Sequence, residues 1–288
     1  MGLLDRLRQL RNAAPADDIA GRTQALVVHG NEFGYDPFGM SRDSVKTAAV
    51  VARWLYRHYF RAEAHGIENL PASGRLILVS NHSGQLPFDG VVIGSACFLE
   101  PPQPRLVRAM VEFFVPTVPF ASYLFSRWGQ ITGTPENCRR LLSAEEAVLV
   151  FPEGARGISK PFSKRYQLAE FGKGFMRLAL ETGSPIVPIA VVGSEEIYPK
   201  IADSSMLARA LGAPDAPITP TFPWLGPLGL IPLPSKWRIE FCDPIDVSSL
   251  GPEAADDRQL VFEISEQVRE TIQQKLYENL VKRGSAFV

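Results

Sequence analysis

The sequence has few cysteines, no excess of basic charge and no long apolar run. Three cysteines scattered over 288 residues are too few for a disulfide framework or a zinc cluster, which favours a reducing compartment and predicts no metal site. The chain has 30 Lys and Arg against 31 Asp and Glu, a formal net charge of -1, which excludes a general nucleic-acid binder held by phosphate contacts. No uncharged apolar stretch is long enough to span a bilayer, and Asp5 and three arginines interrupt the N-terminus before a signal-peptide core. We therefore expect a cytoplasmic protein.

Short apolar runs alternate with helical segments along the middle of the chain. RLILVS at 75–80, EAVLVFPEG at 146–154 and SPIVPIAVVG at 184–193 are apolar and bounded by turn residues, as buried strands are. Between them, one helix is predicted to be capped at Thr134, and a second to run from about Leu168 to Gly183. Strands that alternate with helices predict an α/β fold.

Aromatic and basic side chains share a predicted helix that begins at Asp43 or Ser44 and ends near Arg61. This helix either packs against the domain or lies in a lipid headgroup layer, with its rings at the interface and its arginines on phosphates. The N-terminal MGLLDRLRQLR is open to the same two interpretations. A third segment, 217–234, is too rich in Pro and Gly for a helix, and its Trp, Leu and Ile residues need to be buried or in contact with lipid. These three segments predict peripheral attachment to a membrane.

Two further apolar segments have two interpretations each. Residues 101–128 either form ordinary core or line a channel for an acyl chain. A final helix from about Asp256 carries an apolar residue at every fourth position, a stripe that faces the core or a dimer partner. The sequence makes no prediction of the oligomeric state. The aromatic residues of the segment 101–128 are Phe113, Phe114, Phe120, Tyr123, Phe125 and Trp128.

His82 follows directly after the first predicted strand, in NHSGQLPFDG. Ligands bind at strand ends in α/β sheets, and Asp89 lies seven positions further on, where a turn with Gly84 and Pro87 enters a helix. A carboxylate on one imidazole nitrogen leaves the other free to accept a proton, so the pair suits activation of a hydroxyl group. The alternative is structural, with Asn81, His82 and Asp89 stabilising a strand-to-helix turn through side-chain hydrogen bonds.

A second group of polar residues follows the second predicted strand, in FPEGARGISK at 151–160. Gly154 and Gly157 allow backbone N–H groups to approach an anion closely, and Arg156 and Lys160 are able to neutralise a phosphate. The alternative interpretation of this segment is a solvated basic loop.

The order of three motifs resembles that of the glycerolipid acyltransferases, the lysophosphatidic acid acyltransferase superfamily. The motifs are NHSGQLPFD, FPEGARG about sixty residues later, and IVPIAVVG, and the similarity covers roughly residues 65–250. In that family an H-x4-D motif supplies a catalytic His and the Asp that orients it, and F-P-E-G-T-R binds the acceptor. The resemblance implies His82 as general base and Asp89 as its partner. It also implies that Glu153, Gly154 and Arg156 bind the acceptor. We expect Lys160, in the same segment, to bind the acceptor with them.

The resemblance also implies a fold and a reaction. The fold is a mixed sheet flanked by helices, with amphipathic helices over 1–64, an acyltransferase catalytic domain over 65–250 and a long C-terminal helix over 251–288 packed on the same domain. The reaction is that of a 1-acylglycerol-3-phosphate acyltransferase-like enzyme of phospholipid biosynthesis, peripherally associated with the membrane. His82 takes the proton of a hydroxyl on a lysophospholipid or other glycerolipid. The acyl donor is acyl-CoA or acyl carrier protein, a co-substrate, and no cofactor is bound.

Three features depart from the family pattern. Six residues, not four, separate His82 from Asp89, and Ala155 and Gly157 stand where the family commonly has Thr and Ser. WGQITGTPEN lacks the arginine that helps the family to bind an acceptor phosphate. The segments FGKGFMRLALETG and PWLGPLGLIPLP are similar to the branch that includes diacylglycerol and other neutral-alcohol acyltransferases. The altered spacing and the missing arginine motivate an alternative function, a catalytically inactive lipid-binding or membrane-scaffolding protein of the same fold.

Overall fold

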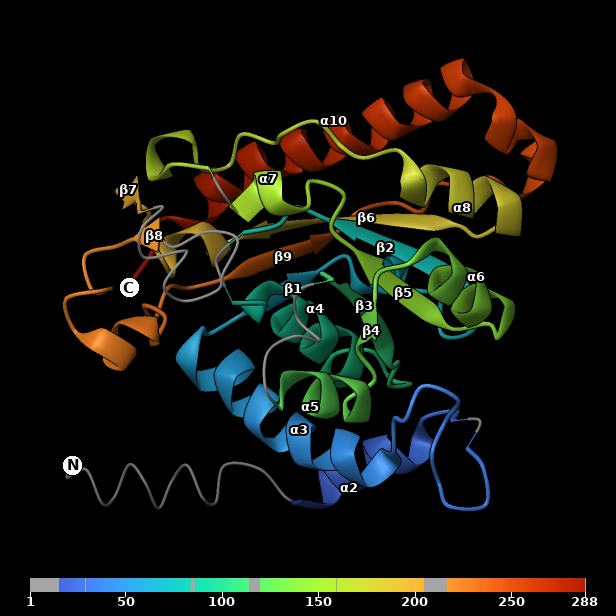
Figure 1. Cartoon of the computed structure of the whole chain (residues 1–288), viewed down its shortest axis with the longest axis horizontal. Coiled ribbons are helices and arrows are strands. Elements are labelled where there is room, and N and C mark those ends of the chain that lie inside the picture. The colour runs from blue at the N-terminus through green and yellow to red at the C-terminus, as the bar shows by residue number, and fades with distance from the viewer. Residues whose placement is uncertain are drawn as a thin grey trace.

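A seven-stranded mixed sheet flanked by helices forms the centre of the molecule, and a long helix, α10 (Arg258–Arg283), crosses one face of the sheet (Figure 1). The predicted fold class is confirmed. The N-terminal MGLLDRLRQLR lies outside the residues that the structure describes. This computed structural model describes residues 16–28, 30–83, 86–113, 120–158, 160–204 and 217–287.

The sheet has the strand order β1-β9-β6-β2-β5-β3-β4. Its neighbouring strands are parallel except β6 and β9, which are antiparallel. The three predicted strands, β2, β5 and β6, are neighbours at the centre of the sheet. A separate antiparallel pair consists of β7 (Ala202–Asp203) and β8 (Pro217–Ile218). The strands of the main sheet are β1 (Glu63–His65), β2 (Leu76–Ser80), β3 (Val107–Val111), β4 (Ile131–Thr132), β5 (Ala147–Val150), β6 (Ile186–Val192) and β9 (Arg238–Phe241).

Helices cover both faces of the sheet, and this explains the uninterrupted apolar runs of β2 and β6. Leu76 and Leu78 of β2 belong to a core shared with α3 and α4, whereas Ile77 and Val79 belong to a second core shared with α6, α8 and α10. Every residue of β2 and of β6 is buried. The other helices are α2 (Ala16–Ala25), α3 (Arg42–Trp54), α4 (Phe88–Leu99), α5 (Ala121–Arg127), α6 (Pro135–Ser143), α7 (Ala155–Ile158) and α8 (Gly174–Thr182).

The aromatic, basic helix near the N-terminus is present, but it begins earlier than predicted. Its cap is Ser41, not Asp43 or Ser44, because the Ser41 side chain accepts a hydrogen bond from the Ser44 N–H. The helix continues as a π-helical turn at Leu55–Tyr59. The rings of Tyr56, in this turn, and Phe60, directly after it, are buried, whereas Trp54 is 42% exposed. The helix therefore packs against the domain and still presents one ring to the surface.

The boundaries of α6 and α8 test the predicted caps. The Thr134 side chain caps α6, as predicted, and α8 ends at Gly183 in the left-handed conformation. α8 begins at Gly174, however, and not near Leu168. The N–H groups of Leu168 and Ala169 donate to the side chains of Gln273 and Glu153, which hold this stretch as a loop.

The apolar stripe of α10 faces the core. Val268, Ile272 and Leu276 are fully buried against β6 and α8. The stripe is therefore a core contact and not a dimer-facing surface. In the described ranges, no helix combines the length and the hydropathy that a bilayer span requires.

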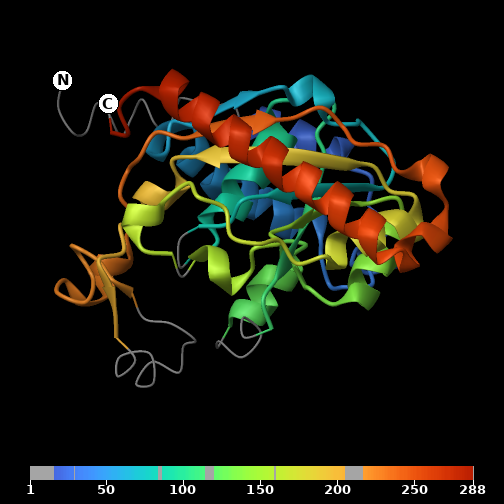
Figure 2. The same ribbon diagram turned by 90° about the horizontal axis from the view of Figure 1, so that it is seen from above.

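The Pro- and Gly-rich segment folds into β8 and a 3-10 turn, η6 (Gly226–Leu230), that stands away from the sheet at one side of the molecule (Figure 2). The Tyr59 hydroxyl donates to the Pro232 carbonyl and ties the segment to the end of α3. The ring of Tyr59 lies 5.6 Å from that of Trp54, between centroids. Exposed apolar residues of the segment are Trp224, Leu225, Leu228, Leu230 and Ile231.

β3 buries an arginine. The guanidinium of Arg108 donates to Asp36 Oδ2 at 2.7 Å, to Glu146 Oε2 at 2.6 Å and to the Gly129 carbonyl at 2.6 Å. Its side chain is fully buried, and that of Asp36 is 3% exposed. A buried charge needs partners, and Arg108 finds them in Asp36 and Glu146. These contacts connect β3 to the loop before α3 and to the start of β5.

Candidate active site

The end of the central strand brings the predicted site residues together. β2 and β5 are parallel neighbours, so the residues that follow them meet at one edge of the sheet. Asn81 ends β2, because its side chain accepts from the Val191 N–H and donates to the Val191 carbonyl in place of a ladder bond. His82 then leaves the sheet beside Phe151, the first residue after β5.

His82 and Asp89 are in direct contact. The distance from His82 Nδ1 to Asp89 Oδ2 is 2.6 Å. Asp89 lies in the first turn of α4 and is fully buried, and its carboxylate also accepts from the Ser83 and Gly90 N–H groups. The two side chains are therefore in contact despite the longer spacing between them. Because Nδ1 is occupied, Nε2 is the imidazole nitrogen left for a ligand.

Two further contacts fix the position of His82. Its ring stacks on the ring of Phe151, with centroids 4.5 Å apart and an interplanar angle of 26°. Its backbone N–H donates to Glu153 Oε1 at 3.1 Å. The imidazole is therefore held at its backbone, its ring face and its Nδ1 atom.

The pKa of His82 is raised above its ordinary value of 6.5 by competing effects. Burial of the ring lowers the pKa, but the charge and hydrogen bond of Asp89 raise it by more, and Glu153 and Glu112 contribute in the same direction. A larger fraction of the imidazole is therefore protonated near neutral pH than in a free histidine.

Glu153 and Lys160 make contacts within the protein. Glu153 is buried, and its Oε2 accepts from the Ala169 N–H at 2.8 Å and from Lys160 Nζ at 3.2 Å. Lys160 Nζ also donates to Glu195 Oε1 at 3.3 Å and to the Gln167 carbonyl. Burial raises the pKa of Glu195 to about 7, although Lys160 and the Tyr166 N–H oppose this. Glu153, Lys160 and Glu195 form a largely buried cluster of charged side chains behind His82.

The other two predicted acceptor residues lie on the loop after β5. Gly154 has a positive φ of 53°, in the left-handed region, which explains a glycine at this position. Arg156 is exposed on α7. The N–H of Gly154 donates to the Phe151 carbonyl, and that of Gly157 to the Gly154 carbonyl. These two amides are therefore engaged within the loop.

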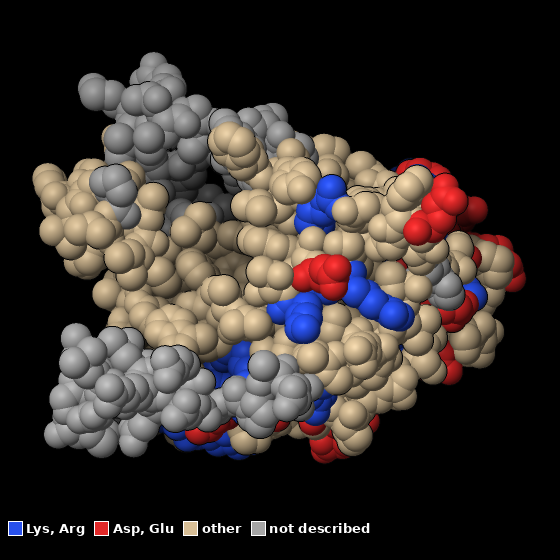
Figure 3. Space-filling model, turned by 90° about the horizontal axis from the view of Figure 1, so that it is seen from below, with Lys and Arg blue, Asp and Glu red and all other residues tan. Residues whose placement is uncertain are grey.

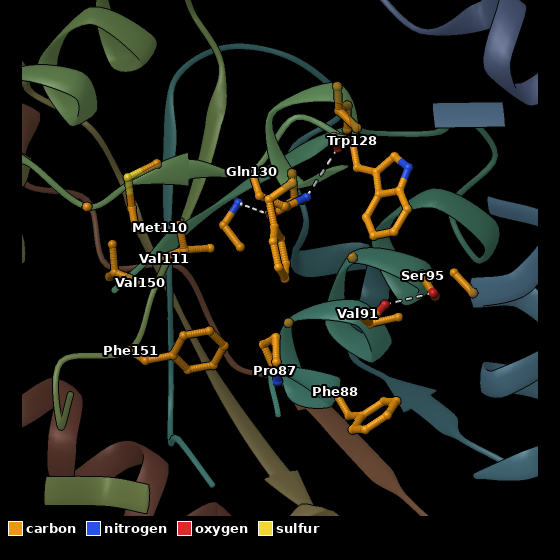
Figure 4. A pocket seen from close by; sticks show the side chains of 18 of the residues that line it. Pro87, Phe88, Val91, Ser95, Met110, Val111, Trp128, Gln130, Val150 and Phe151 are labelled. Carbon is orange, nitrogen blue, oxygen red and sulfur yellow. Dashed lines mark hydrogen bonds between the residues drawn. The ribbon is translucent and has the colours of Figure 1, made fainter. Parts of the chain in front are cut away.

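A cavity of about 830 Å³ opens beside His82. Its wall is formed by α3, α4, β3, the residues around β4, and the loops after β2 and β5. Figure 4 shows labelled side chains of α4, β3, the end of β5 and the segment before β4 gathered around one space. Most lining residues are apolar. From the aromatic segment 101–128, Phe113, Phe125 and Trp128 line the cavity, Phe120 and Tyr123 are exposed, and Phe114 lies outside the described residues.

A cysteine thiol also lines the cavity. Cys138 of α6 lines the cavity, and burial raises the pKa of its thiol to about 11. The thiolate is therefore scarce at neutral pH. Among the described residues that line the cavity, His82 carries the imidazole, the side chain suited to proton transfer near neutral pH.

Sequence reasoning missed two neighbours of His82. Phe151 belongs to the FPEG motif, but nothing in the sequence indicates its stack on the imidazole. Glu112 follows β3 directly and lines the cavity. The rule that ligands bind at strand ends, which led to His82, would also have indicated Glu112 if β3 had been recognised as a strand.

Comparisons with known proteins agree with this arrangement. A family model described as Acyltransferase matches residues 61–192. An uncharacterized protein of Mycobacterium leprae is 43% identical over 261 residues, which cover 89% of this chain and 69% of that protein. A chloroplastic 1-acyl-sn-glycerol-3-phosphate acyltransferase of Brassica napus is 26% identical over 149 residues, 49% of this chain and 40% of that protein.

A solved structure has a similar fold. The crystal structure of the 1-acyl-sn-glycerophosphate (LPA) acyltransferase PlsC from Thermotoga maritima matches with a TM-score of 0.53 at 18% sequence identity. The match covers 82% of this chain and 78% of that one. The family model, the relatives and the fold lead to one conclusion: the chain is an acyltransferase of the glycerolipid acyltransferase superfamily.

Proposed function

We propose that this protein moves a fatty acyl group from a thioester donor to a hydroxyl group of a lysophospholipid or another glycerolipid, with His82 as general base. The observation that carries the proposal is the 2.6 Å contact between His82 and a fully buried Asp89 at the wall of a large apolar cavity. A lipid-binding protein without turnover needs the cavity, but it does not need an oriented imidazole.

The proposed reaction is a direct transfer. His82 Nε2 accepts the proton of the acceptor hydroxyl as its oxygen attacks the thioester carbonyl. The new C–O bond forms and the C–S bond breaks, and the proton passes from the imidazolium to the departing thiolate. Asp89 stabilises the imidazolium through Nδ1. The donor is acyl-CoA or acyl carrier protein, and its acyl chain occupies the cavity, whose volume lies within the range of about 300–1,000 Å³ for ligand sites.

The acceptor-binding roles of Glu153, Gly154, Arg156 and Lys160 stay predictions. The contacts of Glu153 and Lys160 support a different role for these two, which is to position the His82 backbone and the loop after β5. Arg156 is the member of the set whose charged group is exposed to solvent.

The proposal is tested by thiol release from a panel of acyl-CoAs and from acyl carrier protein. The acceptors are lysophosphatidic acid, monoacylglycerol, diacylglycerol and a long-chain alcohol, and the lipid product is followed in parallel. We expect ester formation that depends on the acceptor. Lipid binding without turnover for every donor and acceptor would instead support the scaffolding function.

The pH dependence of the reaction should report the environment of His82. A general base must be neutral, so kcat/KM is expected to rise with pH through an apparent pKa above 6.5, the direction in which Asp89 shifts it. Asp89→Asn removes the negative charge and should move the inflection to lower pH. Initial rates from pH 5 to 9, corrected for thioester hydrolysis without enzyme, give both values. An inflection that stays in place in Asp89→Asn would contradict this assignment.

Gly157→Ala should displace the general base without unfolding the protein. A Cβ at this position would lie 2.9 Å from both the His82 carbonyl oxygen and Glu153 Cβ, so the backbone of His82 must shift. We expect kcat to fall by roughly 100-fold, the effect of misplacing a reacting group by about 1 Å. Gly21→Ala is the control, because nothing lies within 4 Å of its new methyl group. Full activity in Gly157→Ala would argue against a rigid site.

Peripheral membrane attachment is a second part of the proposal. Val50, Val51 and Trp54 of α3 are exposed, and Tyr59 connects the end of this helix to the segment around η6 with exposed Trp224 and its neighbours. The view onto this side of the molecule in Figure 3 has a hollowed area without charged side chains, next to a mixed group of Lys or Arg and acidic side chains. A surface with exposed apolar side chains beside charged ones suits insertion among lipid headgroups.

This attachment predicts an effect of two substitutions on lipid binding. Trp224→Ser with Leu228→Ser should weaken binding to liposomes that contain anionic lipid by at least about tenfold, because two exposed apolar side chains lose their burial in lipid. Cosedimentation at low salt measures the affinity. Val281→Ser on α10, where the side chain is 85% exposed, is the control and should bind as the wild type. Wild-type protein that ignores liposomes would refute the attachment.

A further inference from the structure

A chain of hydrogen bonds leads from the His82 backbone to a glutamate that the proposed reaction does not use. The His82 N–H donates to Glu153 Oε1 at 3.1 Å, and Glu153 Oε2 accepts from Lys160 Nζ at 3.2 Å. Lys160 Nζ in turn donates to Glu195 Oε1 at 3.3 Å. Glu195 belongs to a 3-10 turn, η5 (Ser194–Glu196), that follows β6. Three neighbouring strands, β6, β2 and β5, are thus connected just beyond their ends.

The ammonium group of Lys160 has no hydrogen left for a ligand. An ammonium has three N–H bonds, and three oxygens accept from this one: Glu153 Oε2, Glu195 Oε1 and the Gln167 carbonyl. The side chain is 11% exposed. A ligand can bind this ammonium only by displacing one of the three acceptors. The contacts therefore favour a role for Lys160 in holding its neighbours.

Glu195 is the far end of the chain. Its Oε1 accepts from Lys160 Nζ and also from the Tyr166 N–H at 3.0 Å. Burial raises the pKa of Glu195 to about 7, so both of its protonation states are populated near neutral pH, and each keeps an oxygen that accepts hydrogen bonds. Loss of this side chain would leave two donors in a largely buried place without that acceptor.

The backbone that Glu195 contacts is fixed from other directions. The Tyr166 hydroxyl accepts from the Gly193 N–H at 2.8 Å, and the Tyr166 carbonyl accepts from Gln273 Nε2 of α10, also at 2.8 Å. A lysine side chain, by contrast, has a flexible four-carbon stem. Glu195 therefore joins a fixed backbone segment to the flexible side chain of Lys160.

This inference rests on the proposed function, in which His82 is the general base. We propose that Glu195 is a positioning residue for that base: it holds Lys160, Lys160 holds Glu153, and Glu153 holds the His82 backbone. Glu195 lies outside the three motifs of the resemblance. None of the three charged side chains is among the described residues that line the cavity, so they act on the histidine and not on the substrates.

The first test measures kcat and KM separately in Glu195→Ala, with oleoyl-CoA as donor and 1-oleoylglycerol or 1-oleoylglycerol 3-phosphate as acceptor. We expect kcat to fall by about tenfold, because a displaced general base slows the reaction, while KM for donor and acceptor stays unchanged. Glu195→Gln is the conservative variant, because its amide oxygen can accept the same hydrogen bonds. It should recover most of the kcat that Glu195→Ala loses.

Lys160→Met distinguishes positioning from acceptor binding. A lysine that binds an acceptor phosphate affects KM for the phosphate-bearing acceptor, whereas a lysine that positions Glu153 affects kcat for every acceptor that the wild type uses. We expect kcat to fall by about tenfold or more, because Glu153 and Glu195 lose the cation between them. This variant carries the test by itself if Glu195→Ala does not fold.

Glu266→Ala is the matched control. Glu266 of α10 also bonds a lysine of another segment, Lys173 at 2.9 Å, and it bonds Arg269 at 2.7 Å. In the part of the chain that the structure describes, no hydrogen bond joins either partner to Glu153 or His82. This variant loses a similar pair of contacts and should keep the wild-type kcat. Thermal melting gives the folded fraction of each variant.

The outcomes separate this inference from the proposed function. A higher KM at unchanged kcat in Glu195→Ala or Lys160→Met would overturn the inference in favour of substrate binding. Unchanged kinetics would overturn it as well, and so would a loss of kcat that Glu195→Gln does not restore or that Glu266→Ala shares. If the wild type forms no ester with any donor and acceptor, the proposed function itself fails, and the positioning role fails with it.

Discussion

Replacing His82 with alanine is expected to lower kcat/KM for acyl transfer by about 1,000-fold or more. General base catalysis contributes roughly 100- to 10,000-fold, and no other described side chain at the cavity is placed to accept the proton. Asp89 is already bound to His82 Nδ1, and burial raises the pKa of the Cys138 thiol to about 11, so that its thiolate is scarce. The residual rate in His82→Ala should therefore no longer show the inflection above pH 6.5.

The measurement is acceptor-dependent ester formation under conditions in which the wild type turns over. Asp89→Asn is a milder variant for comparison, because it keeps the side-chain volume and leaves the imidazole in place. We expect its kcat/KM to lie between that of His82→Ala and that of the wild type. Thermal melting shows whether both variants fold. Unchanged turnover in a folded His82→Ala protein would refute the assigned base and direct attention away from this end of the sheet.

Arg108→Met should destabilise the fold by about 3–5 kcal/mol, more than any surface substitution. The guanidinium is fully buried and bonds Asp36, Glu146 and the Gly129 carbonyl, so its loss leaves the buried carboxylate of Asp36 without a counter-charge. Methionine fills much of the volume, which separates the charge effect from a cavity effect. Denaturant unfolding measures the free energy, provided that the transition is two-state.

Two further variants isolate the cause. Adding Asp36→Asn to Arg108→Met should recover part of the loss, because the unpaired charge is then removed. Arg139→Met is the matched control: Arg139 pairs with Glu181 across an exposed surface, and its loss should cost no more than about 1 kcal/mol. Equal effects of the two arginine substitutions would mean that burial of Arg108 is unimportant for its contribution.

The centre of the fold could be predicted because its signals are local. β2, β5 and β6 are recognisable as short apolar runs, and the rule that ligands bind at strand ends selected His82 from four histidines. Asp89 could be proposed as its partner because a turn leads directly into a helix. The contact between them could not be derived from spacing alone, because it depends on the path of the turn.

The missed features depend on contacts that are distant in sequence. α8 starts late because Gln273, about a hundred residues away, bonds the Leu168 N–H. The contacts of Lys160 depend on Glu195, which follows β6. The need for a glycine at Gly157 follows from the approach of the His82 backbone. Local propensity contains no information on any of these, so sequence reasoning found the residues and misjudged what they touch.

The bond between the His82 amide and Glu153 has a consequence for hydrogen exchange. Glu153 is buried, and the two groups belong to the loops that leave the two central strands, so we expect this amide to exchange when those loops part. Amides on η6, by contrast, belong to a segment that stands away from the sheet and exchange through small local openings. Exchange of the His82 amide in deuterated solvent therefore reports how often the two loops that hold the catalytic histidine move apart.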